Sequence, residues 1–169
     1  MIKKQIQEAL NTQINAELSS AYLYLSMSLD AENKGFGGVA NWMFVQWKEE
    51  QDHARILQLY MISQSAPVML HPIEEVKTNW CCLLDMFNDA LKYEQKVTQM
   101  IHRLSLLAMQ EQDLATLNRL MWFVNEQTEE EQNVSSIISR LELVGDDGTG
   151  MHLIDQCLAE RKYCPADAL

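Results

Sequence analysis

The sequence contains few of the residues that interrupt helices. Its 169 residues include only three prolines and six glycines. Apart from Pro165, these residues fall in three short stretches, at 35–38, 63–79 and 145–150. The segments between these stretches are long and have apolar residues at helical spacing, which predicts an all-α protein.

Long apolar runs are also missing. Hydrophobic residues make up 47% of the chain, but no segment approaches the roughly 18 uninterrupted apolar residues that a membrane-spanning helix requires. The first eight residues, MIKKQIQE, lack the apolar core of a signal peptide. We therefore expect a cytoplasmic protein that has no membrane partner.

Cysteine motifs and excess positive charge are absent as well. The four cysteines form no C-x-x-C motif and are not paired with spaced histidines, so free thiols are expected rather than a zinc or rubredoxin-like iron site. The formal charge is −11 and the pI is about 4.7. This acidity argues against nucleic acid and anionic membranes as partners, and it suits a cation without identifying one.

The helical segments predict a four-helix bundle in one domain that covers residues 1–169. The expected helices run over residues 3–33, 39–64, 82–111 and from a turn at 112–113 to 144, and a short fifth helix occupies 151–160. The connection at 63–79 is long enough to cross the bundle between the second and third helices. One long crossover of this kind distinguishes ferritin-like bundles from simple up-and-down bundles.

Each long helix has an inward stripe of apolar residues that polar residues interrupt. In the second helix the stripe passes through Glu50 and His53, which are three residues apart and therefore point the same way. The other three stripes carry Glu17, Glu94, Gln127 and Glu130. An unpaired carboxylate in a core costs several kcal/mol, and a Glu-x-x-His pair that projects into a bundle is typical of one half of a two-metal site.

These six polar residues repeat along the chain. The same offset of 77 residues separates Glu17 from Glu94, Glu50 from Gln127, and His53 from Glu130. We interpret the repeat as two helix hairpins about a pseudo-twofold axis, each of which contributes one lone glutamate and one i, i+3 pair to a shared site. The alternative is six isolated core polar groups, which would each need a separate partner.

The ligand set favours iron or manganese. Its four carboxylates balance two divalent ions, or two trivalent ions with a bridging oxide, so the site would tolerate a metal that changes oxidation state. Carboxylates with one imidazole and no thiolate disfavour copper(I) and structural zinc, although zinc could occupy the site without turnover.

Several neighbours of the cluster have two interpretations. Tyr24 could hydrogen-bond a ligand or supply an electron, or it could be an ordinary core tyrosine. Trp122 is interpreted as a packing residue. The residues that adjoin the ligands but point off the stripes could form a third metal site or a solvated acidic face; they are Glu49, Glu126 and Glu129.

The first helix has a second apolar stripe. It consists of Ile14, Leu18, Leu25 and Leu29, with Tyr22 beside it. A helix that is apolar on two faces is buried on two faces, so this stripe predicts a subunit interface in a homo-oligomer.

The chain resembles the bacterial non-haem ferritins over essentially its whole length. The matching features are Glu17 with Tyr24, EEQDH at 49–53, YEQ at 93–95 and NEQTEEE at 125–131. Gln127 and Glu130 are discriminating, because the haem-binding bacterioferritins carry a second E-x-x-H at this place. The resemblance therefore implies a protein without haem.

The resemblance implies a cage of twenty-four subunits that stores ferric mineral, and a ferroxidase activity in which O2 or H2O2 oxidises two Fe(II) ions per subunit. One iron would be bound by Glu17, Glu50 and His53. The other would be bound by Glu50, Glu94 and Glu130, with Gln127 near the oxygen-binding side. A third iron site would match Glu49, Glu126, Glu129 and Glu130, and the fifth helix would line the four-fold axis.

The resemblance does not extend to one feature of animal ferritins, and two other functions stay open. Leu117 and Leu120 stand where animal ferritins have acidic residues that line three-fold iron channels. A dodecameric DNA-protecting mini-ferritin would lack the helix expected at 151–160. A non-enzymatic helical bundle, such as a secreted signalling protein, would have no carboxylates in its core.

Overall fold

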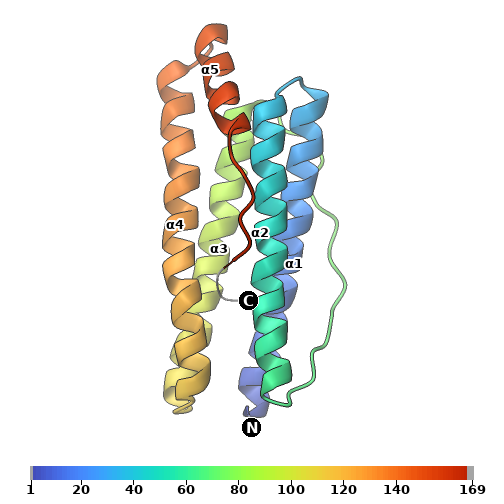
Figure 1. Cartoon of the computed structure of the whole chain (residues 1–169), viewed down its shortest axis with the longest axis vertical. Helices are drawn as coiled ribbons and strands as arrows, with labels where there is room; N and C mark the ends of the chain where they lie inside the picture. Colours follow the sequence, from blue (N-terminus) through green and yellow to red (C-terminus); the bar gives the residue numbers. More distant parts are fainter. Residues whose placement is uncertain (1, 167–169) are drawn as a thin grey trace.

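The computed structural model describes residues 2–166 as a bundle of long helices (Figure 1). In chain order the helices are α1 (Lys4–Asn33), α2 (Gly37–Ser63), α3 (Leu83–Gln110), α4 (Leu114–Val144) and α5 (Gly148–Ala159). The described residues contain no strand and no helix long and apolar enough to cross a membrane. The predicted all-α bundle with a short fifth helix is confirmed.

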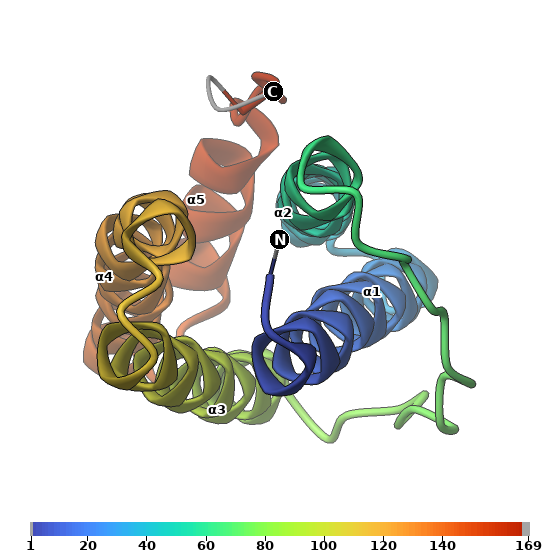
Figure 2. The ribbon, with the colours of Figure 1, turned by 90° about the horizontal axis from the view of Figure 1, so that it is seen from below.

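The long helices form two hairpins. Helix α1 packs against α2 and α3 packs against α4, while α1 and α3 join the two hairpins. Helix α5 contacts both α2 and α4, and the end-on view shows it between them (Figure 2). The seam between α2 and α4 is therefore covered by α5 at one end of the bundle.

Two helices begin earlier than the sequence predicted. Helix α2 begins at Gly37 instead of residue 39, because the turn needs only residues 34–36, with Gly35 at a φ of 82°. Helix α5 begins at Gly148 instead of residue 151. The side chain of Asp147 accepts hydrogen bonds from the backbone N–H groups of Thr149 and Gly150, which stabilises this earlier first turn.

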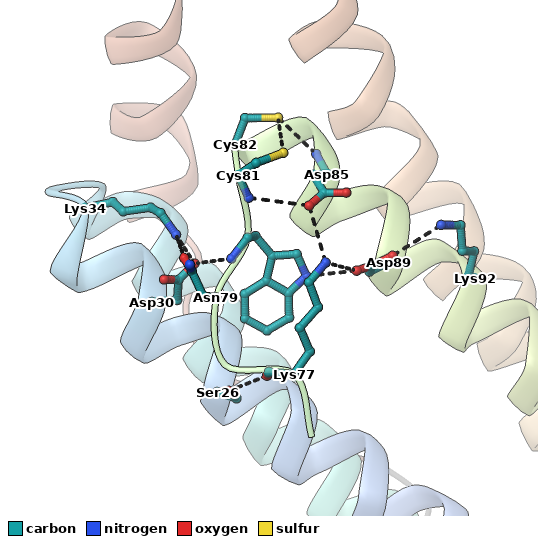
Figure 3. A network of polar contacts seen from close by, with 11 residues as sticks. Ser26, Asp30, Lys34, Lys77, Asn79, Cys81, Cys82, Asp85, Asp89 and Lys92 are labelled. Atoms are coloured by element: carbon teal, nitrogen blue, oxygen red, sulfur yellow. Dashed lines mark hydrogen bonds and ion pairs between the residues drawn. The ribbon is translucent and has the colours of Figure 1, made fainter. Parts of the chain in front are cut away.

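The end of the crossover at 64–82 is held by a network of polar contacts (Figure 3). Trp80 is buried, and its indole Nε1 donates to Asp89 Oδ2 at 3.0 Å. Its backbone N–H donates to Asp30 Oδ2 at 3.2 Å. Lys77 forms ion pairs with Asp85 at 3.3 Å and with Asp89 at 2.7 Å. The crossover, which connects α2 to α3, is thus fixed at this end to both α1 and α3.

All four cysteines are free and exposed, as expected. Cys82 is the N-cap of α3, where its Sγ accepts from the backbone N–H of Asp85. The Sγ atoms of Cys81 and Cys82 are 3.8 Å apart.

The core consists of two apolar clusters with a polar belt between them. One cluster includes Met27, Trp42, Phe87 and Ile137 near α5, and the other includes Leu10, Leu57, Ile101 and Phe123 towards the opposite end. On every long helix the polar residues predicted to face inward fall between these two clusters. The belt therefore crosses the bundle near its middle.

The second apolar stripe of α1 is only partly used within the subunit. Ile14 is fully buried, but Tyr22 is 51% exposed and Leu29 is 60% exposed. These exposed side chains are available to pack against another subunit, and the subunit interface stays a prediction.

Close contact between α5 and α2 can be tested at Gly38. A Cβ atom at Gly38 would lie 1.7 Å from the backbone oxygen of Asp155 in α5. We expect Gly38→Ala to displace α5 and to lower the free energy of unfolding by about 2 kcal/mol, since overpacking typically costs 1–3 kcal/mol. Thermal unfolding followed by circular dichroism measures the change.

Gly37→Ala is the matched control, because a Cβ atom there would meet nothing within 4 Å. We expect it to be neutral or slightly stabilising. Equal unfolding temperatures for the two variants would contradict the proposed backbone contact.

Candidate metal centre

The polar belt gathers the six residues that the sequence predicted to form a shared site. Each of these residues is at most 3% exposed. They are Glu17, Glu50, His53, Glu94, Gln127 and Glu130. Four helices contribute to the belt, because each places its polar residues at the same height between the two apolar clusters. Four carboxyl groups and one imidazole are therefore enclosed in the middle of the bundle.

Glu17, Glu50 and His53 form the first group of potential metal ligands. One ligand atom from each residue lies within 4.8 Å of the other two. Glu17 Oε2, Glu50 Oε1 and His53 Nδ1 are buried and have no hydrogen-bond partner. Buried polar atoms normally have partners, so an unpartnered atom on each of three residues that gather in this way indicates a place for a cation.

The second half of the belt is held by neutral donors. Tyr24 donates its hydroxyl hydrogen to Glu94 Oε1 at 2.5 Å, and Gln127 Nε2 donates to Glu94 Oε2 at 3.1 Å. Gln46 Nε2 donates to Glu130 Oε2 at 2.6 Å. Of the two interpretations of Tyr24, the contact with Glu94 supports hydrogen bonding to a ligand residue.

Burial shapes the electrostatics of the centre. Loss of solvation, with a smaller effect of nearby Glu50, raises the pKa of Glu17 to about 8. Desolvation also raises the pKa of Glu94, and it holds the pKa values of Glu50 and Glu130 well above their ordinary range. A cation that binds this cluster would therefore have to displace the proton that burial favours on Glu17.

Three further glutamates line a pocket beside the centre. Glu49, Glu126 and Glu129 line it together with His53 and Trp122. His53 Nε2 is 3.9 Å from Glu126 Oε1, whereas His53 Nδ1 is 3.6 Å from Glu50 Oε2. The imidazole thus stands between the buried centre and this pocket.

A second group of potential ligands lies beside this pocket, and the ring of Trp122 packs against one of its members. His53, Glu126 and Glu130 each place a ligand atom within 4.8 Å of the others. The ring of Trp122 meets the imidazole edge to face, with the centroids 5.6 Å apart. Trp122 packs against the histidine, in agreement with its predicted packing role.

The sequence did not single out the residues that support the carboxylates. Gln13 Nε2 donates to Glu17 Oε1 at 2.8 Å, and Gln46 holds Glu130 as described above. Both glutamines lie on the inward stripes, one turn before a buried glutamate. That position was the feature of the sequence that could have identified them as supporting residues. Arg161, which donates to Gln46 Oε1 at 2.7 Å, follows α5 and gave no such signal.

Comparisons with known proteins identify the family of this bundle. The family model described as a ferritin-like domain matches residues 7–144. The chain belongs to the ferritin family. This ferritin is 37% identical to the bacterial non-haem ferritin of Bacteroides fragilis over 161 residues, which cover 95% of this chain and 100% of the relative. It is 33% identical to that of Staphylococcus aureus over 163 residues, or 96% and 98% of the two chains.

Solved ferritin structures agree with the fold of this ferritin. The open-pore ferritin of Archaeoglobus fulgidus has 41% identity and a TM-score of 0.95, with coverage of 96% of this chain and 100% of that one. A humanized archaeal ferritin has 40% identity and a TM-score of 0.96, with coverage of 98% and 100%. The predicted ferritin-like topology and the resemblance to bacterial non-haem ferritins are confirmed, and both support iron storage as the general role.

The raised pKa of Glu17 predicts how the metal-free protein responds to pH. Burial raises the pKa of Glu17 from 4.5 to about 8. Between pH 4.5 and about pH 8, the folded state therefore holds a proton at Glu17 that the unfolded chain has lost. This group therefore contributes full stability below pH 4.5 and loses it as the pH rises towards 8, at up to about 1.4 kcal/mol per pH unit. Glu17→Gln should flatten this slope and stabilise the metal-free protein at pH 7.

Denaturant unfolding at several pH values measures the slope, with chelator present to keep metal away. Exposed Glu142 provides the control, because Glu142→Gln removes one carboxylate and should leave the slope unchanged. A Glu17→Gln protein as pH-dependent as the parent would show that Glu17 is ionised in the folded state.

Proposed function

We propose that this chain is the subunit of an iron-storage ferritin and that its centre is a ferroxidase site. The observation that carries the proposal is the gathering of Glu17, Glu50 and His53, each of which has a buried side-chain atom without a hydrogen-bond partner. Hard carboxylate oxygens with one imidazole suit Fe(II). A second ion beside the first would draw on Glu50, Glu94 and Glu130.

The substrate of this reaction is a pair of Fe(II) ions. Two Fe(II) ions give up two electrons, and O2 takes up these electrons and two protons to become H2O2; with H2O2 as the oxidant the product is two molecules of water. Four glutamates can neutralise the four positive charges of the two ferrous ions. The proton that burial favours on Glu17 would leave as iron enters.

The surrounding side chains position the ligands during this reaction. Gln13 and Gln46 each occupy one oxygen of a glutamate and leave the other oxygen for metal. Tyr24 and Gln127 hold Glu94 from both sides and would release one oxygen when the second ion binds. We propose that Tyr24 and Gln127 tune the ligand geometry, and that Gln127 lies next to the bound oxidant.

The pocket of Glu49, Glu126 and Glu129 is the proposed third iron site, with Glu130 on its inner side. Its acidic lining and the approach of His53 Nε2 support this role. An ion that leaves the ferroxidase centre would meet these carboxylates first, on its way to the mineral.

The proposed assembly is a cytoplasmic homo-oligomer, a cage of about twenty-four copies without haem, nucleic acid or membrane partners. The exposed apolar face of α1 supports an interface, and α5 supports a full-length ferritin rather than a dodecameric mini-ferritin. The buried carboxylates argue against a purely structural bundle. The whole chain, residues 1–169, is proposed to act as one domain.

Substitution of the shared ligand tests the centre. Glu50→Ala removes the carboxylate that both ions would share, so rapid oxidation of Fe(II) should fall by at least a hundredfold while the cage stays assembled. Stopped-flow absorbance after aerobic mixing with two Fe(II) per subunit measures the rate.

Glu142→Ala, on the exposed side of α4, is the control and should oxidise iron as the parent does. A fast phase that persists in an assembled Glu50→Ala cage would place the oxidation elsewhere.

Stoichiometry and particle mass test the assembly together with the reaction. We expect the fast phase to saturate near two Fe(II) per subunit, on a particle of about twenty-four subunits by light scattering or native mass spectrometry. Slow oxidation without saturation on a small oligomer would instead favour a binding or structural role.

A further inference from the structure

The segment after α5 returns along α2 towards the metal centre. The side-chain amide of Asn41 on α2 donates to the backbone oxygens of Leu158 and Ala159 at the end of α5, and to that of Arg161 at 3.0 Å. The segment 160–166 is thereby directed along α2 (Figure 1). Its own side chains then reach residues that flank the ligands.

Two further contacts dock this segment. Tyr163 donates its hydroxyl hydrogen to Asp52 Oδ2 at 2.6 Å, and the backbone N–H of Ala166 donates to the same oxygen at 3.3 Å. Cys164, Pro165 and Ala166 form one wall of the pocket that contains Glu49, Glu126 and Glu129. The docked segment is therefore part of the proposed third iron site.

Arg161 places a positive charge on one of the carboxylates of that site. Its guanidinium lies over the ring of Trp42, 4.4 Å from the centroid, and Nη2 donates to Glu49 Oε2 at 2.5 Å. The other terminal nitrogen, Nη1, donates to Gln46 Oε1 at 2.7 Å. This second bond orients the Gln46 amide so that its Nε2 donates to Glu130.

One guanidinium thus holds a carboxylate of the pocket and, through Gln46, a ligand of the buried centre. Both side chains of the ion pair are about one-fifth exposed, so the pair is partly shielded from water. A cation that binds Glu49 through Oε2 must compete with Arg161, because the same oxygen cannot serve both at full strength. His53, which is 1% exposed, turns Nε2 into the pocket, where it lies beyond hydrogen-bond distance of Glu126.

We propose that Arg161 is a positioning residue that acts as a tethered counter-ion. It holds Glu49 when the pocket contains no metal and leaves Glu49, with the 160–166 segment, when a third ion binds. Through Gln46, this exchange couples occupancy of the pocket to the orientation of Glu130 in the ferroxidase centre. The inference rests on the proposed function of the pocket as an iron site.

Anaerobic titration of the assembled, metal-free cage with Fe(II) in a calorimeter tests the competition. Arg161→Gln should tighten binding of the third ion per subunit by about tenfold, because a charge-assisted hydrogen bond no longer opposes it. Arg161→Lys keeps the charge and should stay near the parent. Lys162→Gln is the matched control, since it removes the same charge from an exposed side chain one position away.

Hydrogen exchange of the C-terminal peptide, followed by mass spectrometry, provides a readout that does not depend on turnover. Exchange in the 160–166 peptide of the parent should rise when the third ion binds but not when the first two bind. In Arg161→Gln the exchange should already be high without metal.

Two results would overturn the inference. One concerns the affinity for the third ion: it would be unchanged in Arg161→Gln, or it would change equally in Lys162→Gln. An equal change would assign the effect to bulk charge. The other is hydrogen exchange in the 160–166 peptide that does not change when the third ion binds. Failure of the proposed function of the pocket looks different, because neither the parent nor Arg161→Gln would then bind a third Fe(II) after the first two.

Discussion

The cost of burying four carboxyl groups at one height of the bundle governs the structure around them. Desolvation raises the pKa of each of these glutamates, because a charged carboxylate is costly to enclose without a cation beside it. Apolar clusters above and below the belt supply the stability that this arrangement lacks. Stability that an all-apolar core would have provided is given up for a site where cations bind well.

The supporting side chains explain how the carboxylates keep their positions without being neutralised. Gln13, Gln46, Gln127 and Tyr24 are neutral donors, so they fix the glutamate oxygens and leave their negative charge available to iron. A lysine or arginine in their place would hold the glutamates more strongly but would cancel that charge. Arg161, by contrast, reaches the belt through Gln46 and pairs with Glu49 outside it.

The sequence predicted the features that depend on periodicity. Glu50 and His53, three residues apart on an apolar stripe, had to face the core, and the 77-residue offset located their counterparts on α3 and α4. Helix ends were less predictable, because the start of α5 depends on side-chain capping by Asp147. The path of residues 160–166 could not be predicted at all, since it depends on where α5 docks. Docking in turn depends on the absence of a side chain at Gly38.

The two halves of the 77-residue repeat are synthesised one after the other, and they contribute different residues to the centre. Glu17, Glu50 and His53 all belong to the first hairpin, whereas Glu94, Gln127 and Glu130 lie beyond the crossover. During synthesis the residues of the first hairpin leave the ribosome before those of the second. All three members of the first group of potential ligands are therefore made within the first 63 residues, whereas the proposed second ion also needs residues that follow the crossover.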